Sequence, residues 1–163
     1  EHGYKEAAPP ARTDRHNAGS DTLQVHLLVY VNTLAPVMEK PVRLQFETPC
    51  PQIRPAEIAV LEASLKPLLK FILLDQSTDK YSRRAVHKPL VSTVSVAIEA
   101  VDNALLIKVT DDSPAVILLG QQTRELQRRL PKSVSKLACT PAAGLGRCFA
   151  FVLARRGGNA VVP

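Results

Sequence analysis

Two long segments of the chain place apolar residues at the spacing of a helix face. The first starts near Ser20 and Asp21, whose side chains can cap a helix, and the second starts at Ala56. The apolar positions are Leu23, Leu27, Tyr30, Val31 and Leu34 in the first segment and Val60, Leu61, Leu65, Leu68, Leu69 and Ile72 in the second. Pro67 lies inside the second segment, and we expect it to bend that helix without ending it.

Alternating apolar and polar residues predict strands over residues 42–46, 94–98 and 105–109. Asp102 and Asn103 separate the last two strands and predict a hairpin turn. Residues 75–88 form a polar, basic connector ahead of this hairpin. After it, we expect residues 111–141 to be irregular, apart from a short helix near residues 123–130.

The end of the chain predicts one more helix and then a strand. The apolar residues at helical spacing are Leu145, Cys148, Phe149, Val152 and Leu153. Gly157 and Gly158 would end this helix, and residues 160–162 would begin the strand. We expect residues 1–20, which show no periodicity, to be a disordered leader or linker, and residues 21–163 to be one domain. This order predicts an α/β (α+β) two-layer sandwich, with one mixed sheet covered by helices.

Composition narrows the choice of function. The net charge is +6, but lysine and arginine are spread along the chain, and only 4% of residues are aromatic. A groove that stacks single-stranded nucleic acid on aromatic rings is therefore not expected. The three cysteines form no Cys-x-x-Cys pair, which argues against a zinc site or a disulfide framework and favours a reducing cytosol. No apolar run approaches the roughly 20 residues of a membrane-spanning helix.

Three segments, in this order, resemble the nucleotide-binding boxes of histidine kinases. They are LLDQSTDKYS at residues 73–82, LLIKVTDDSPAV at residues 105–116 and AAGLGRCFAFVLARRGGNAVV at residues 142–162. The first is similar to the Asn-containing box and the second to the Asp-x-Gly-x-Gly box. The third is similar to the glycine-rich box with the helix that follows it. Over residues 21–163 the chain thus resembles the histidine kinase-like ATPases, the GHKL family with the Bergerat fold.

This resemblance implies a site for a purine triphosphate. Asp111, at the exit of a buried strand, would accept a hydrogen bond from the adenine amino group. Gly144 and Gly146 would let the backbone approach the phosphates, and a helix starting at Arg147 would offer free N–H groups to them. The alternative is that Asp111 caps a turn and that the Gly-x-Gly sequence is only a turn.

Several family positions are altered. The Asn that holds Mg²⁺ in the family would fall on Ile72, which cannot coordinate a metal, and Gln76, next to Asp75, replaces a second Asn. Ser113 and Ala115 replace the glycines of the second box. We therefore assign Asp75, Gln76, Asp111, Gly144 and Gly146 as candidate nucleotide contacts, and no catalytic or metal-binding residue.

The leading hypothesis is a degenerate histidine-kinase-like domain of a two-component signalling protein. It would act in phosphorelay or dock on a response regulator or on the dimerisation helices of a kinase, with weak or no ATP binding and no Mg²⁺. The alternative is an active ATP-dependent sensor kinase domain with a non-standard metal site. A third option, an adaptor domain that mimics the boxes by chance, would show a different sheet order. The expected location is the cytoplasm, including as the soluble portion of a membrane-bound sensor, with no nucleic-acid or membrane contact.

Two other groups of residues have simpler interpretations. His26 lies on a helix, but the acidic residue of a phosphoacceptor motif does not follow it, so we expect a core or interface histidine. A basic set is expected to be an exposed face, with a lid that reaches phosphates as the alternative. Its members are Arg124, Arg128, Arg129, Lys132 and Lys136.

Overall fold

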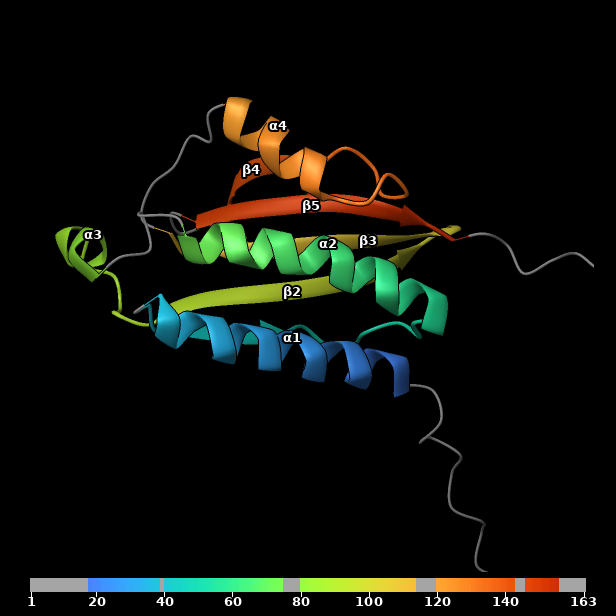
Figure 1. Ribbon diagram of the computed structural model, residues 1–163, viewed down its shortest axis with the longest axis horizontal. Helices are drawn as coiled ribbons and strands as arrows, with labels where there is room; N and C mark the ends of the chain where they lie inside the picture. The colour runs from blue at the N-terminus through green and yellow to red at the C-terminus, as the bar shows by residue number, and fades with distance from the viewer. Residues whose placement is uncertain (1–17, 39, 75–79, 114–119, 143–145, 156–163) are drawn as a thin grey trace, which may run out of the picture.

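The computed structural model describes residues 18–38, 40–74, 80–113, 120–142 and 146–155 (Figure 1). The helices are α1 (Ala18–Val37), α2 (Pro55–Leu74), α3 (Lys80–Ala85) and α4 (Gly120–Arg129). The strands are β1 (Val42–Phe46), β2 (Ser92–Val101), β3 (Ala104–Asp111), β4 (Ala138–Ala142) and β5 (Gly146–Ala154). None of the helices in these ranges is long and apolar enough to cross a membrane.

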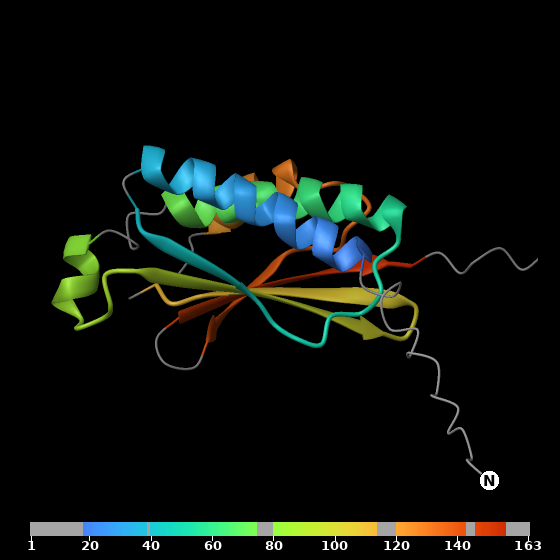
Figure 2. The same cartoon turned by 90° about the horizontal axis from the view of Figure 1, so that it is seen from below.

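The strands form one mixed sheet in the order β1-β2-β3-β5-β4. β1 runs parallel to β2, and the other neighbouring pairs are antiparallel. Figure 2 shows α1, α2 and α4 together on one face of this sheet, and none of the described helices covers the other face. The predicted two-layer sandwich with one mixed sheet is therefore confirmed.

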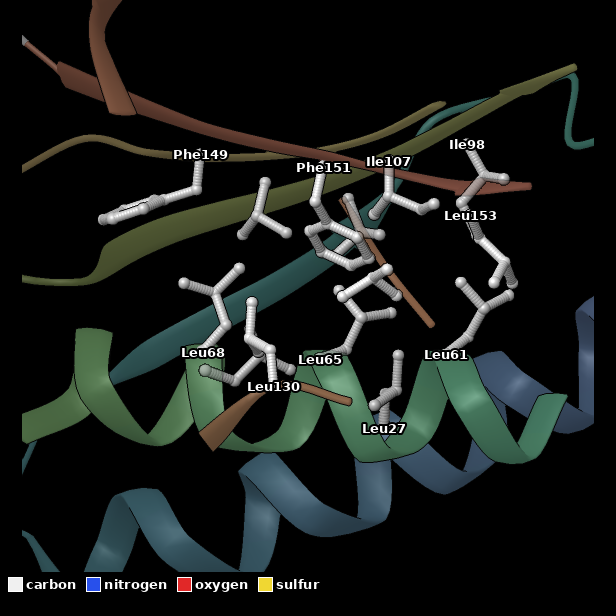
Figure 3. Close-up of a cluster of buried hydrophobic side chains, with 14 of the residues drawn as sticks. Leu27, Leu61, Leu65, Leu68, Ile98, Ile107, Leu130, Phe149, Phe151 and Leu153 are labelled. Atoms are coloured by element: carbon white, nitrogen blue, oxygen red, sulfur yellow. The ribbon is translucent and has the colours of Figure 1, made fainter. Parts of the chain in front are cut away.

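The core lies between this sheet face and α2 (Figure 3). Leucines 61, 65 and 68 of α2 are fully buried and point at the strands, where Ile107 and Phe151 are buried too. Burying one such side chain stabilises the fold by roughly 1.5–3 kcal/mol. Side chains along β3 and β5 point alternately toward the helices and away from them. Asp111, at the end of β3, and Arg147, near the start of β5, are among those that point toward the helices. The core pattern thus continues into the candidate site.

The two long helices, the strand at residues 42–46 and the hairpin at residues 92–111 are confirmed. The first helix starts at Ala18, ahead of the expected cap, and the second continues through Pro67. The short helix near residues 123–130 is α4. Asp102 in the hairpin turn has a φ of 52°, a conformation that aspartate tolerates better than most residues.

The predicted final helix is wrong, because residues 146–154 form β5. The sequence GRCFAFVLA repeats apolar residues at both helical and strand spacing, and its burial alternates with a period of two. Pairing with β3 on one side and β4 on the other satisfies its backbone as a strand. Gly157, Gly158 and the strand expected at residues 160–162 lie outside the described residues.

Two further elements lie in segments expected to lack regular structure. α3 interrupts the connector at residues 75–88, and β4 lies within residues 111–141. β4 contains Pro141, which a strand tolerates at the edge of a sheet because proline donates no backbone hydrogen bond.

Candidate functional site

The candidate site residues that the structure describes lie together. Asp111 ends β3, Gly146 begins β5, and Asp111 pairs in register with Arg147. A Cβ atom added at Gly146 would lie 2.3 Å from the Asp111 carbonyl oxygen, so this contact requires glycine. Asp111 and Gly146 are therefore in contact. Asp75, Gln76 and Gly144 lie outside the described residues.

The Asp111 carboxylate is buried and ion-paired with Arg147. The Arg147 Nη2 atom lies 2.5 Å from Oδ2, and its Nε atom lies 3.2 and 3.1 Å from Oδ1 and Oδ2. The Ser113 hydroxyl donates to Oδ2 at 3.1 Å and accepts from Arg147 Nη2 at 3.1 Å. The two charged side chains are 0% and 1% exposed. Both carboxylate oxygens therefore already accept hydrogen bonds within the protein.

The guanidinium of this pair contacts an aromatic ring, that of Phe149. Its central carbon lies 5.4 Å from the centre of the Phe149 ring, within the range of a cation–π contact. Phe149 in turn meets Phe71 of α2 edge-on, with ring centres 6.2 Å apart. Arg147 thus connects the end of β3 to the helix layer.

The neighbouring Asp112 binds a second buried arginine. Arg83 of α3 is fully buried and donates from Nη1 and Nη2 to the two carboxylate oxygens, at 3.0 and 2.8 Å. Ser92 Oγ and the Thr93 backbone N–H also donate to Oδ1, at 3.0 and 3.1 Å. Burial raises the pKa of Asp112, but the hydrogen bonds from Arg83, Thr93 and Ser92 outweigh it and hold the pKa below its usual value.

The structure places Ile72 in the core rather than in a metal site. It is 1% exposed and belongs to the cluster that α2 forms with the sheet, whereas Leu74, two residues later, is 53% exposed. Within the described ranges, no group of three or more potential metal-ligating side chains comes together.

The third box does not have the expected geometry. Gly146 leads into β5, so the helix start that was to offer its N–H groups to phosphates from Arg147 does not exist. The helix that follows Asp111 in the chain is α4, which begins at Gly120. The basic residues at positions 124, 128, 129, 132 and 136 are exposed on α4 and on the turn after it, as expected for a solvated face.

The cavities lined by described residues include one at the other end of β2. It measures about 380 Å³ and is lined by residues 47–51 and 97–100, so Asp111 does not contribute to it. His26 lies on α1, where its Nδ1 atom contacts the carboxylate of Glu62 on α2. This contact is consistent with the interface histidine predicted from the sequence.

No family model matches the chain, and no curated protein matches it. Solved structures do. Histidine kinase AdeS of Acinetobacter baumannii superposes with a TM-score of 0.53 at 11% identity, covering 85% of this chain and 66% of AdeS. The histidine kinase domain of the Erythrobacter litoralis blue-light activated kinase EL346 gives 0.50 at 14%, covering 81% and 60%.

The catalytic domain of histidine kinase ThkA, in a nucleotide-free form, gives a TM-score of 0.54 at 10% identity. This superposition includes 83% of this chain and 92% of the ThkA domain. The chain spans less than two thirds of the length of the Erythrobacter structure. The chain has the fold of a histidine kinase catalytic domain.

Proposed function

We propose that this chain is a degenerate kinase-like domain of a two-component signalling protein. It works in the cytoplasm by docking on a response regulator or on the dimerisation helices of a kinase, and it binds ATP weakly or not at all. Residues 21–163 form the working domain, and residues 1–20 form a leader or linker. The observation that supports this proposal best is the buried ion pair between Asp111 and Arg147.

An adenine amino group has to compete for this carboxylate. Its hydrogen bond would replace one from a guanidinium that is itself 1% exposed. Separating a buried ion pair leaves an uncompensated charge, which costs about 3–5 kcal/mol. A hydrogen bond from the neutral adenine amino group to a charged carboxylate returns only about 1.5–3 kcal/mol. Base recognition through Asp111 is therefore unfavourable while Arg147 stays in place.

The described residues also do not fit a Mg²⁺ ion near this carboxylate. Mg²⁺ requires several oxygen ligands in octahedral geometry. Ile72 offers none, and the carboxylate oxygens of Asp112 already accept from Arg83, Ser92 and Thr93. The described residues near Asp111 therefore do not support phosphoryl transfer assisted by Mg²⁺.

The second candidate function is an active ATP-dependent kinase domain. Asp75 and Gln76 follow α2 and carry the oxygen atoms that a non-standard metal site would use. ThkA and AdeS, which share this fold, are named histidine kinases, and this likeness of fold is the observation that favours the second candidate.

Thermal unfolding in millimolar Mg-ATP separates the two candidates. A ligand at a hundred times its dissociation constant stabilises the folded state by about 2.7 kcal/mol, which raises the Tm of a chain this size by several degrees. We expect a shift within error of that caused by Mg²⁺ alone. A reproducible rise of several degrees with Mg-ATP, lost in Asp111→Asn, would establish the active alternative.

A further inference from the structure

α3 projects from the molecule at the end where β3 exits. Figures 1 and 2 both show it beyond the end of the sheet, away from the layer of α1, α2 and α4. We call residues 80–91, which comprise α3 and the return to β2, the α3 knob. Its exposed large apolar side chains are Tyr81 at 82%, Val86 at 42%, Leu90 at 40% and Val91 at 41%. Apolar side chains concentrated on one projecting segment are characteristic of an interaction site.

The knob is fixed in place by Arg83, although a six-residue helix is too short to be stable alone. Besides its two bonds to the Asp112 carboxylate, Arg83 donates to the carbonyl oxygens of Pro89 and Val91, within the knob itself. Lys88 Nζ donates to the Asp112 carbonyl at 2.7 Å. The start and the end of the knob are thus bound to the same point at the end of β3.

The C-terminus of α3 is closed by a Schellman motif. Lys88 N donates to Arg83 O at 2.9 Å, and His87 N donates to Arg84 O at 3.1 Å. His87 has a φ of 58°, the left-handed conformation that this motif requires. The backbone of the knob is therefore ordered, and its exposed side chains lose little further backbone freedom on binding.

The chemistry of the knob indicates its partner. Residues 80–92 contain no acidic residue. Arg83 is buried against Asp112, so the positive charge at the surface of the knob comes from the exposed Arg84 and the half-buried Lys88. Tyr81 and Arg84 are three residues apart on α3, so they lie on the same side of the helix, and both are exposed. Tyrosine and arginine are among the residues enriched at interface hot spots. A complementary partner surface would have a pocket for the Tyr81 ring and carboxylates next to that pocket.

We propose that the α3 knob docks on an acidic protein surface of a response regulator receiver domain, with Tyr81 as the anchor and Arg84 pairing with a carboxylate. This inference rests on the proposed docking function and adds the surface that performs it. Charge complementarity favours an acidic partner. A single tyrosine is not the row of aromatic rings that single-stranded nucleic acid uses.

The test is a titration of the full chain with purified receiver domains encoded by the same genome, each labelled and followed by fluorescence anisotropy. We expect at least one receiver to bind, and we expect Tyr81→Ala and Arg84→Glu each to weaken that binding roughly tenfold or more. Both side chains are exposed, so circular dichroism and Tm should match the parent chain.

Matched controls identify the surface. Val101→Ala removes an exposed apolar side chain at the far end of β2, and Arg128→Glu reverses an exposed charge on α4. Both should leave receiver binding unchanged. Binding that Arg128→Glu abolishes and the knob variants do not would overturn the knob and keep the docking function.

If no receiver binds the parent chain, the knob proposal and docking on a response regulator are both rejected, whereas docking on the dimerisation helices of a kinase is not. Labelled duplex DNA and vesicles of phosphatidylglycerol with phosphatidylcholine are titrated in parallel. Binding to either one that depends on Tyr81 and Arg84, without receiver binding, would assign the knob to a different class of partner and contradict the proposal.

Discussion

At the scale of single residues, the end of β3 is organised by two consecutive aspartates. Asp111 is the last residue of β3 and is buried on the face of the helix layer, and Asp112 follows directly after the strand. Each binds its own buried arginine, Arg147 on β5 and Arg83 on α3. The pair at Asp111 keeps a charge in the core, and the pair at Asp112 fixes a projecting segment.

The buried pair at Asp111 predicts a strongly coupled response to mutation. Arg147→Met should lower the free energy of unfolding by about 3–5 kcal/mol, because Asp111 remains as a buried charge without its partner. Urea unfolding followed by circular dichroism measures this loss.

The double variant Asp111→Leu/Arg147→Met is the control, and it should recover at least half of the loss, since no charge is then buried. Additive losses from the two single variants would contradict the ion pair as described.

The sequence located Asp111 but not its partner. A carboxylate at a strand exit is a local pattern, and the structure places Asp111 at the end of β3, paired in register with Arg147. Arg147 was missed because its segment was interpreted as a helix. The alternation of Arg147, Phe149, Phe151 and Leu153 was the signal for an inward-facing strand residue.

At the scale of elements, local periodicity succeeded where it was unambiguous. The long helices and the β2–β3 hairpin followed their patterns because each buries one clear face. β5 fits two periods, and only its place between β3 and β4 selects the strand. α3 has no strong pattern, because Arg83 and not an apolar face anchors it.

The cap of α3 yields a prediction at this scale. His87→Gly should raise the free energy of unfolding by about 0.5–1 kcal/mol. Glycine adopts the left-handed conformation without the steric penalty of a Cβ atom, and part of this gain is offset because glycine has more conformational entropy in the unfolded chain. His87 is exposed, so little packing is lost. Chemical denaturation measures the change.

Ala85→Gly, in the last turn of α3, is the comparison and should destabilise by up to about 1 kcal/mol. If the two glycine variants shift stability in the same direction, the assigned cap is wrong.

At the scale of the whole molecule, ion pairs lie at both ends of the sheet and connect it to helices. The pair of Asp112 and Arg83 lies where β3 ends. The pair of Glu57 and Arg155 lies at the opposite end. Arg155 is located there because its backbone N–H donates to the carbonyl oxygen of Asn103, just before β3, at 2.7 Å. Burial raises the pKa of Glu57, but hydrogen bonds from Arg155 and Arg54 outweigh it and lower the pKa below its usual value. Both ends therefore require ionised carboxylates.

These lowered pKa values predict the acid dependence of stability. A carboxyl group whose pKa is lower in the folded state than in the unfolded state stabilises the folded state at any pH above its unfolded pKa. The unfolded pKa values are 3.8 for aspartate and 4.5 for glutamate. This stabilisation is lost as the pH falls through the folded-state pKa. The free energy of unfolding should be nearly flat from pH 7 to about 5 and fall at lower pH.

Urea titrations at a series of pH values measure this curve. The variant Asp112→Asn/Glu57→Gln should be less stable at pH 7 and should lose less on acidification. A decline as steep as in the parent chain would show that other carboxylates control acid unfolding.

The sequence by itself determined the two long helices α1 and α2, the short helix α4, the hairpin, the sheet-and-helix class and the position of Asp111. These features depend on the period of apolar residues and on local turn chemistry. Only the tertiary structure decided that residues 146–154 form a strand, that Arg147 binds Asp111, and that Arg83 fixes α3. These features depend on contacts between residues about 30 positions or more apart, and such contacts are made only once the sheet is assembled.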